Sequence, residues 1–188
     1  MQLPRLVTPA RLRFALILGL LLTVAANVGL AGNTRGPKEF AALEDALATS
    51  LTRTVLEGLP HPGAEREVFE AERQKPHRVI DGQTFYETPL TPPLAEVAEL
   101  TAALLAPGAV IDWEGEKKCG GFHADVALAT TDGRGTWHVH LCFGCGEVLV
   151  TGGRLKREVR FDLSAAGLGK ARELVRTWRT RRPPPAHE

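Results

Sequence analysis

Cysteine and histidine side chains gather between residues 119 and 145 of the chain. Cys119 precedes His123 by four residues, and Cys142 and Cys145 form a CxxC pair that is followed by glycine. Thiolate and imidazole groups at such spacings are typical ligands of tetrahedral zinc, and glycines let the chain turn so that both thiolates point inward. The pattern therefore predicts a structural zinc site made of Cys119, His123, Cys142 and Cys145.

The same cysteines support other interpretations. In an exported protein, Cys119 can form a disulfide with Cys142 or with Cys145, which leaves one free thiol. The three thiols can also be buried apolar residues without chemistry, or the CxxC pair can be redox-active. These alternatives to zinc stay open at the level of the sequence.

Further polar side chains surround the predicted zinc site. Cys142 with His123 or His140 has the residue types of a thiol nucleophile and its base. Asp125 is a candidate acceptor that would orient His123. His138 and His140 share one strand face, so they are alternative metal ligands. No third ligand lies opposite these two histidines in the predicted pairing, and we interpret them as a partly solvated polar face.

The elements that must position this cluster are two strands joined by the turn at residues 132–135, whose sequence Asp-Gly-Arg-Gly is typical of a hairpin. Pairing the strands across this turn places Val126 opposite Leu141 and Ala127 opposite His140. The apolar pair then lies on one face of the sheet and the histidine on the other. Because a shift of one residue would mix the two faces, the sequence predicts this antiparallel register.

Hydrophobic periodicity along the rest of the chain predicts an α+β fold. Helical spacings, Pro37 and the cap residue Ser164 predict three helices, at about 38–57, 93–106 and 164–180. Alternating and β-branched runs predict strands at about 78–90, 110–113, 123–131, 136–150 and 157–163. The expected architecture is an antiparallel sheet of about four to six strands with helices packed on one face, preceded by an N-terminal apolar export or anchor helix.

The first 32 residues have the features of an export signal. Three arginines precede an apolar run at residues 14–31, and no acidic residue occurs before Glu39. The length of the run lies between that of a cleaved signal and that of a membrane-spanning anchor. We therefore expect a periplasmic or extracellular protein, or one anchored in the cytoplasmic membrane by residues 14–31.

Composition limits the classes of function. The chain has 188 residues, 44% of them hydrophobic, and a net charge of +1. This is the mix of a globular protein, and it excludes collagen-like, fully disordered and multi-spanning membrane chains. The near-neutral charge and the few aromatic residues in the basic C-terminal part argue against a nucleic-acid partner.

The expected organisation of the chain has four parts. They are a signal peptide or membrane anchor at 1–32, a linker with an amphipathic helix at 33–60, the α+β domain with the Cys/His cluster at 61–182, and a disordered tail at 183–188.

Two short segments carry a resemblance. The runs CGGFHAD at 119–125 and CFGCGE at 142–147 resemble an uncharacterised family of bacterial exported proteins with a CGGFHxD…CFGCxE-type motif, over about residues 78–180. The resemblance implies that Cys119, His123, Asp125, Cys142, Cys145 and Glu147 belong to one motif. The family has no assigned activity, so no catalytic role is carried over.

These observations predict a non-enzymatic domain associated with the cell envelope. A structural Cys/His site, holding zinc or a disulfide, would stabilise a surface that serves binding or assembly with a protein partner. The alternative is a thiol- or metal-dependent enzyme centred on Cys142, with His123 or His140 as its base.

Export is testable directly. N-terminal sequencing of the protein purified from its native compartment should give a start at Asn27 or Gly32 if the signal is cleaved, and at Met1 if the run is a membrane anchor. A full-length protein that fractionates as soluble and cytoplasmic would contradict the prediction.

Overall fold

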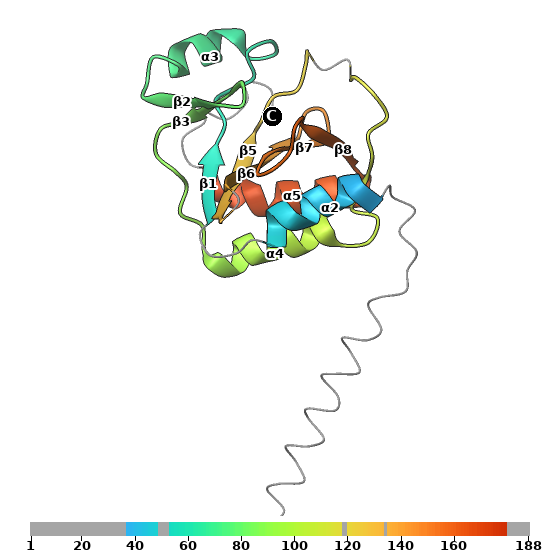
Figure 1. Cartoon of the computed structure of the whole chain (residues 1–188). Helices are drawn as coiled ribbons and strands as arrows, with labels where there is room; N and C mark the ends of the chain where they lie inside the picture. Colours follow the sequence, from blue (N-terminus) through green and yellow to red (C-terminus); the bar gives the residue numbers. More distant parts are fainter. Residues whose placement is uncertain (1–36, 49–52, 118–119, 134, 180–188) are drawn as a thin grey trace, which may run out of the picture. The chain divides into compact units, whose positions relative to one another are not determined.

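The computed structural model describes residues 37–48, 53–117, 120–133 and 135–179, all within one compact unit (Figure 1). The helices are α2 (Pro37–Ala48), α3 (Arg66–Glu72), α4 (Leu94–Leu105) and α5 (Ala165–Trp178). The strands are β1 (Arg53–Glu57), β2 (His77–Ile80), β3 (Gln83–Tyr86), β4 (Val110–Asp112), β5 (Val126–Asp132), β6 (Gly135–Cys142), β7 (Glu147–Gly152) and β8 (Val159–Leu163).

Two of the predicted segments cannot be compared with the structure. The apolar run at 14–31 and the tail at 183–188 lie outside the described residues. Within the ranges that the structure describes, no helix has both the length and the apolar character needed to cross a membrane.

Six strands form one antiparallel sheet in the order β1-β5-β6-β7-β8-β4, and β2 and β3 form a separate hairpin. The α+β class and the antiparallel sheet are confirmed. The predicted register is confirmed too, because Val126 lies opposite Leu141 and Ala127 opposite His140. Burial of the apolar face fixes this register, since a one-residue slip would expose every core side chain of the strand.

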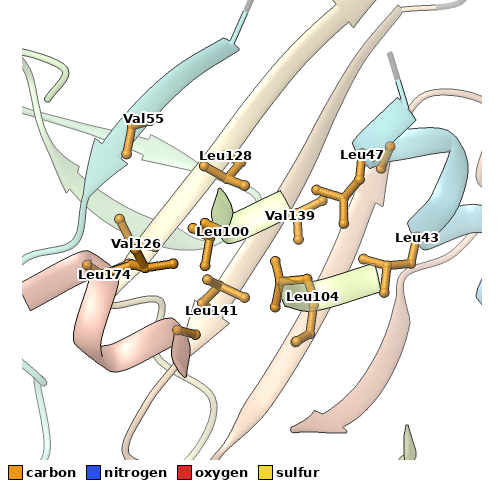
Figure 2. Close-up of a cluster of buried hydrophobic side chains, with 14 of the residues drawn as sticks. Leu43, Leu47, Val55, Leu100, Leu104, Val126, Leu128, Val139, Leu141 and Leu174 are labelled. Atoms are coloured by element: carbon orange, nitrogen blue, oxygen red, sulfur yellow. The ribbon is translucent and has the colours of Figure 1, made fainter. Parts of the chain in front are cut away.

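The main core lies between one face of the sheet and helices α2, α4 and α5 (Figures 1 and 2). The sheet contributes alternate residues of each strand, including Leu128, Val139 and Leu141. Leu43 of α2, Leu104 of α4 and other fully buried leucines pack against them. Helices therefore cover this face, as the sequence predicted.

The opposite face of the sheet is covered in part by the β2–β3 hairpin. Phe85 of β3 is fully buried there in a small cluster with Leu56, Ala124 and Ala127. Helix α3 is joined to the hairpin through the Tyr86 hydroxyl, which donates to the Glu72 carboxylate at 2.8 Å. The polar face that carries the histidines thus lies under a second, smaller layer.

Two predicted elements have different limits in the structure. The predicted helix at 38–57 is wrong beyond Ala48, because Arg53–Glu57 forms β1 and pairs with β5. Leu47 and Val55 both lie in the main core, but Leu47 belongs to α2 and Val55 to β1. Their helical spacing in the sequence therefore does not mean that they share a helix. The predicted strand at 136–150 is split by a turn at 143–146, where Gly146 adopts a φ of +68°.

Leu141→Ala should lower the free energy of unfolding by about 2–4 kcal/mol, because it leaves a cavity at a fully buried position. Urea denaturation measures this change. Leu94→Ala is the matched control: Leu94 is 84% exposed, and we expect a change within about 0.5 kcal/mol. Equal losses in the two variants would contradict the assignment of Leu141 to the core.

Candidate metal centre and cysteine turn

Asp81, His138 and His140 converge on the face of the sheet opposite the main core. His138 and His140 are alternate residues of β6, so both point to that face. Asp81 is at the tip of the β2–β3 hairpin, in a two-residue turn where Asp81 and Gly82 have φ values of 51° and 77°. Such a turn matches the twist of the two strands, and it carries the Asp81 carboxylate onto the histidines.

The ligand atoms of the three residues are close enough to share one ion. They lie within 4.8 Å of one another, and no other such group of His, Cys, Asp and Glu occurs among the described residues. Asp81 Oδ2 is 2.8 Å from His138 Nδ1 and 3.4 Å from His140 Nε2. The Thr151 hydroxyl, on β7, donates to the same carboxylate oxygen and lies 3.3 Å from His140 Nε2.

The surroundings set the charge of these groups. Burial, together with the neighbouring His138, lowers the pKa of His140 to about 4, against the opposing effect of Asp81. Its imidazole is therefore neutral near pH 7. Burial acts to raise the pKa of Asp81, but hydrogen bonds from Thr151 and His138 outweigh it, so the pKa lies below the usual value and the carboxylate is ionised. A neutral imidazole beside a carboxylate is the form in which both bind metals.

The spacing of the ligand atoms and the surroundings of His140 both bear on metal binding. Ligand bonds of about 2.0–2.1 Å at tetrahedral angles put ligand atoms roughly 3.3 Å apart. The distances from Asp81 Oδ2 to the two imidazole nitrogens, 2.8 and 3.4 Å, are similar. A metal on Nε2 of His140 would leave the ring proton on Nδ1, which is buried and has no hydrogen-bond partner among the described residues. Loss of the hydrogen bond that orients a histidine ligand lowers metal affinity by about 10–100-fold.

The three side chains differ in their access to solvent. His140 is fully buried, whereas the side chains of His138 and Asp81 are 15% and 37% exposed. Three protein ligands leave at least one coordination position of a metal ion open. Water or another ligand can reach that position from the side of His138 and Asp81, whose side chains are partly exposed. Closed structural zinc sites instead use four protein ligands.

The CxxC pair lies in the turn between β6 and β7. Cys142 is a buried free thiol, whereas Cys145 is disulfide-bonded. The backbone N–H groups of Cys145 and His123 both donate to Cys142 Sγ, the first at 3.2 Å. The His123 ring, in turn, packs 5.0 Å from that of His61. The backbones of His123 and Cys145 therefore lie against the Cys142 thiol, but the ligand atoms of these three residues form no cluster among the described residues.

The chemistry of this group differs from a thiolate zinc site. A sulfur in a disulfide is not a thiolate, so Cys145 cannot bind zinc while it is oxidised. Cys119, the fourth predicted ligand, lies outside the described residues. The disulfide alternative thus agrees with the oxidised state of Cys145, and the zinc site of Cys119, His123, Cys142 and Cys145 stays a prediction for the reduced chain.

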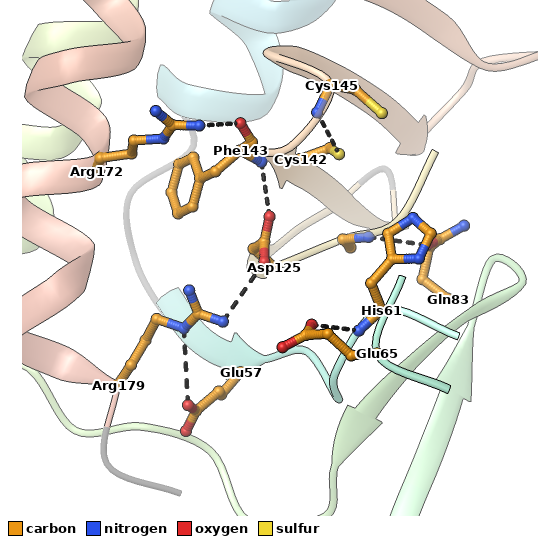
Figure 3. Close-up of polar contacts among 11 residues, drawn as sticks. Glu57, His61, Glu65, Gln83, Asp125, Cys142, Phe143, Cys145, Arg172 and Arg179 are labelled. Atoms are coloured by element: carbon orange, nitrogen blue, oxygen red, sulfur yellow. Dashed lines mark hydrogen bonds and ion pairs between the residues drawn. The ribbon is translucent and has the colours of Figure 1, made fainter. Parts of the chain in front are cut away.

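Asp125 connects the cysteine turn to helix α5 (Figure 3). Its carboxylate accepts a hydrogen bond of 2.6 Å from the backbone N–H of Phe143 and lies 3.5 Å from the Arg179 guanidinium. Its own N–H donates to the Leu141 carbonyl, although Val126 already lies opposite Leu141. Two residues opposite one form a bulge, so Asp125 does not continue the predicted register toward Cys142. Its role in orienting His123 stays a prediction.

A partly buried ion-pair network extends from Asp125. Arg179, which directly follows α5, also lies 3.9 Å from the fully buried carboxylate of Glu57 on β1. Arg172 of α5 donates to the carbonyl of Phe143. The turn that carries both cysteines therefore contacts Arg172 of α5 directly and is linked to Arg179 through Asp125.

Two residues of the metal centre were missed by sequence reasoning. The residues opposite His138 and His140 on β5 are alanines and supply no ligand. The third candidate ligand, Asp81, comes from a hairpin outside that pairing, and the interpretation of the histidines as partly solvated is wrong for His140, which is fully buried. The only sequence signal of Asp81 was the Asp-Gly pair of a tight turn. Thr151 lies opposite His138 on β7, so a correct boundary between β6 and β7 would have found it.

Comparison with known proteins adds no assignment to this geometry. No family model, curated protein or solved structure matches the chain. The resemblance to exported bacterial proteins therefore stays a prediction.

Thiol counting distinguishes the disulfide from the zinc-thiolate interpretation. One disulfide among three cysteines leaves one thiol, so denatured and unreduced protein should react with one equivalent of an aromatic disulfide reagent. The folded protein should react slowly, because Cys142 is buried and burial raises the pKa of its thiol. After reduction we expect three equivalents. Three thiols without reduction, released together with zinc, would contradict the disulfide.

Proposed function

We propose that this chain is an exported, non-enzymatic domain that binds one divalent transition-metal ion, zinc in the first place, through Asp81, His138 and His140. The observation that carries the proposal is the convergence of three ligand atoms within 4.8 Å from two separate parts of the chain. Two imidazoles and one carboxylate suit zinc, copper(II), nickel and iron rather than calcium or magnesium.

The alternative function, a thiol enzyme centred on Cys142, has less support. A catalytic thiol is exposed and has a lowered pKa, whereas Cys142 is buried and its pKa is raised. The nearby Asp125 and Glu147 carboxylates add to that raise. We therefore assign Cys142 a packing role in the turn and place the binding chemistry at the Asp81 centre.

Metal titration of the full chain tests the proposal. Isothermal titration with zinc, checked by metal analysis after dialysis, should show one equivalent bound per chain. Asp81→Asn and His138→Gln should each weaken binding by more than about 100-fold, since loss of a ligand costs more than the 10–100-fold of a supporting contact. His77→Gln is the matched control, because His77 is an exposed histidine of the same hairpin at the end away from the tip.

Three results would point elsewhere. Absence of binding, or equal binding by the wild type and both ligand variants, would contradict the Asp81 centre. Binding that appears only after reduction and is lost in Cys142→Ser would instead support the zinc site of Cys119, His123, Cys142 and Cys145.

A further inference from the structure

The β2–β3 hairpin contacts the rest of the domain along β3 and at its tip. The β3 backbone forms a bridge with Gly58 at Phe85, and the Thr84 carbonyl accepts a hydrogen bond of 3.1 Å from the Leu59 N–H. At the base of the hairpin, Phe85 is fully buried and stacks on His140, with ring centroids 5.8 Å apart.

Next to the tip of the hairpin, the Gln83 side chain accepts a hydrogen bond of 2.9 Å from the N–H of Ala124. At its tip, the polar contacts of Asp81 with the histidines and Thr151 reach the sheet.

The layer that contains the hairpin is the weaker of the two. Its hydrophobic cluster has four buried residues, whereas the main core draws on three helices and all six strands of the sheet. Val79 of the hairpin is 63% exposed and adds nothing to this cluster. Segments with few buried apolar contacts open locally before the rest of the protein unfolds. The hairpin is therefore expected to leave the sheet more often than β5–β8 separate.

The metal ligands lie on opposite sides of this opening motion. His138 and His140 stay with the sheet, and Asp81 moves with the hairpin tip. The closed form offers three ligands and the open form two, so an ion has a differential affinity for the closed form. Only such a difference allows a ligand to shift a conformational equilibrium.

We propose, on the basis of the function proposed above, that the bound metal ion acts as a clamp that controls how often the β2–β3 hairpin leaves the sheet. Because the open form keeps two ligands, it binds the ion more weakly than the closed form, and the open population falls by at most a factor of one plus the ratio of free metal to its dissociation constant. At a free metal concentration of 100 times that constant, hairpin opening falls by up to about 100-fold. The site would thus regulate exposure of the apolar face beneath Phe85.

Hydrogen exchange of the full chain, with and without zinc at 100 times its measured dissociation constant, tests the clamp. Amides of β2 and β3 should exchange up to about 100-fold more slowly with zinc in the wild type and in His77→Gln. In Asp81→Asn the same zinc concentration should leave their exchange unchanged. Asparagine tolerates the left-handed conformation of this turn, so the variant keeps the hairpin while losing the carboxylate.

The outcomes separate the two proposals. If one zinc ion binds but hairpin exchange does not slow, the clamp is overturned and the metal centre stands. If slowing occurs equally in Asp81→Asn, the ion acts through other ligands and the clamp by Asp81 is overturned. If titration shows no zinc bound, the proposed function fails, and the clamp fails with it.

Discussion

The alternation of side chains along β6 is the constraint on which the rest of the structure depends. Val139 and Leu141 point into the main core, so their neighbours His138 and His140 must point to the other face. Burial of the apolar side leaves no freedom to shift the strand, because a one-residue slip would put imidazoles against the helices. The position of both histidines is therefore a consequence of core packing, and no local interaction of their own is needed to explain it.

The sequence predicted the parts of the fold that depend on local patterns. The β5–β6 register followed from one turn and from alternating burial, and both are encoded within about twenty residues. The limits of the first helix were not predictable in this way. Val55 fits a helical spacing, yet its pairing with Leu128 of β5 makes it part of a strand. That pairing joins segments far apart in the chain, and tertiary contacts of this kind override local preference.

The candidate metal centre also combines features that the local sequence encodes with features that depend on distant contacts. The two histidines were visible as an alternating pair, but Asp81 lies 57 residues from His138 and belongs to another sheet. A single sequence does not show where the tip of the β2–β3 hairpin lies on the face of the six-stranded sheet. The cysteine turn was visible as a CxxC pair, whereas the oxidation state of Cys145 depends on the three-dimensional approach of a second sulfur. Spacing alone cannot distinguish a disulfide from a thiolate ligand.

The contacts already present at Asp81 determine what a metal ion can change. His138, His140 and Thr151 all surround one carboxylate oxygen, so the Asp81 carboxylate has hydrogen-bond partners within the protein, whereas His140 Nδ1 has none among the described residues. A metal ion must replace some of these bonds, and its net contribution is the difference between coordination and the contacts that it displaces. These contacts distinguish the Asp81 centre from the sites of small zinc-dependent domains, whose folding is coupled to metal binding. An ion bound as proposed would connect the hairpin to the sheet, and this is a connection that the main core does not provide.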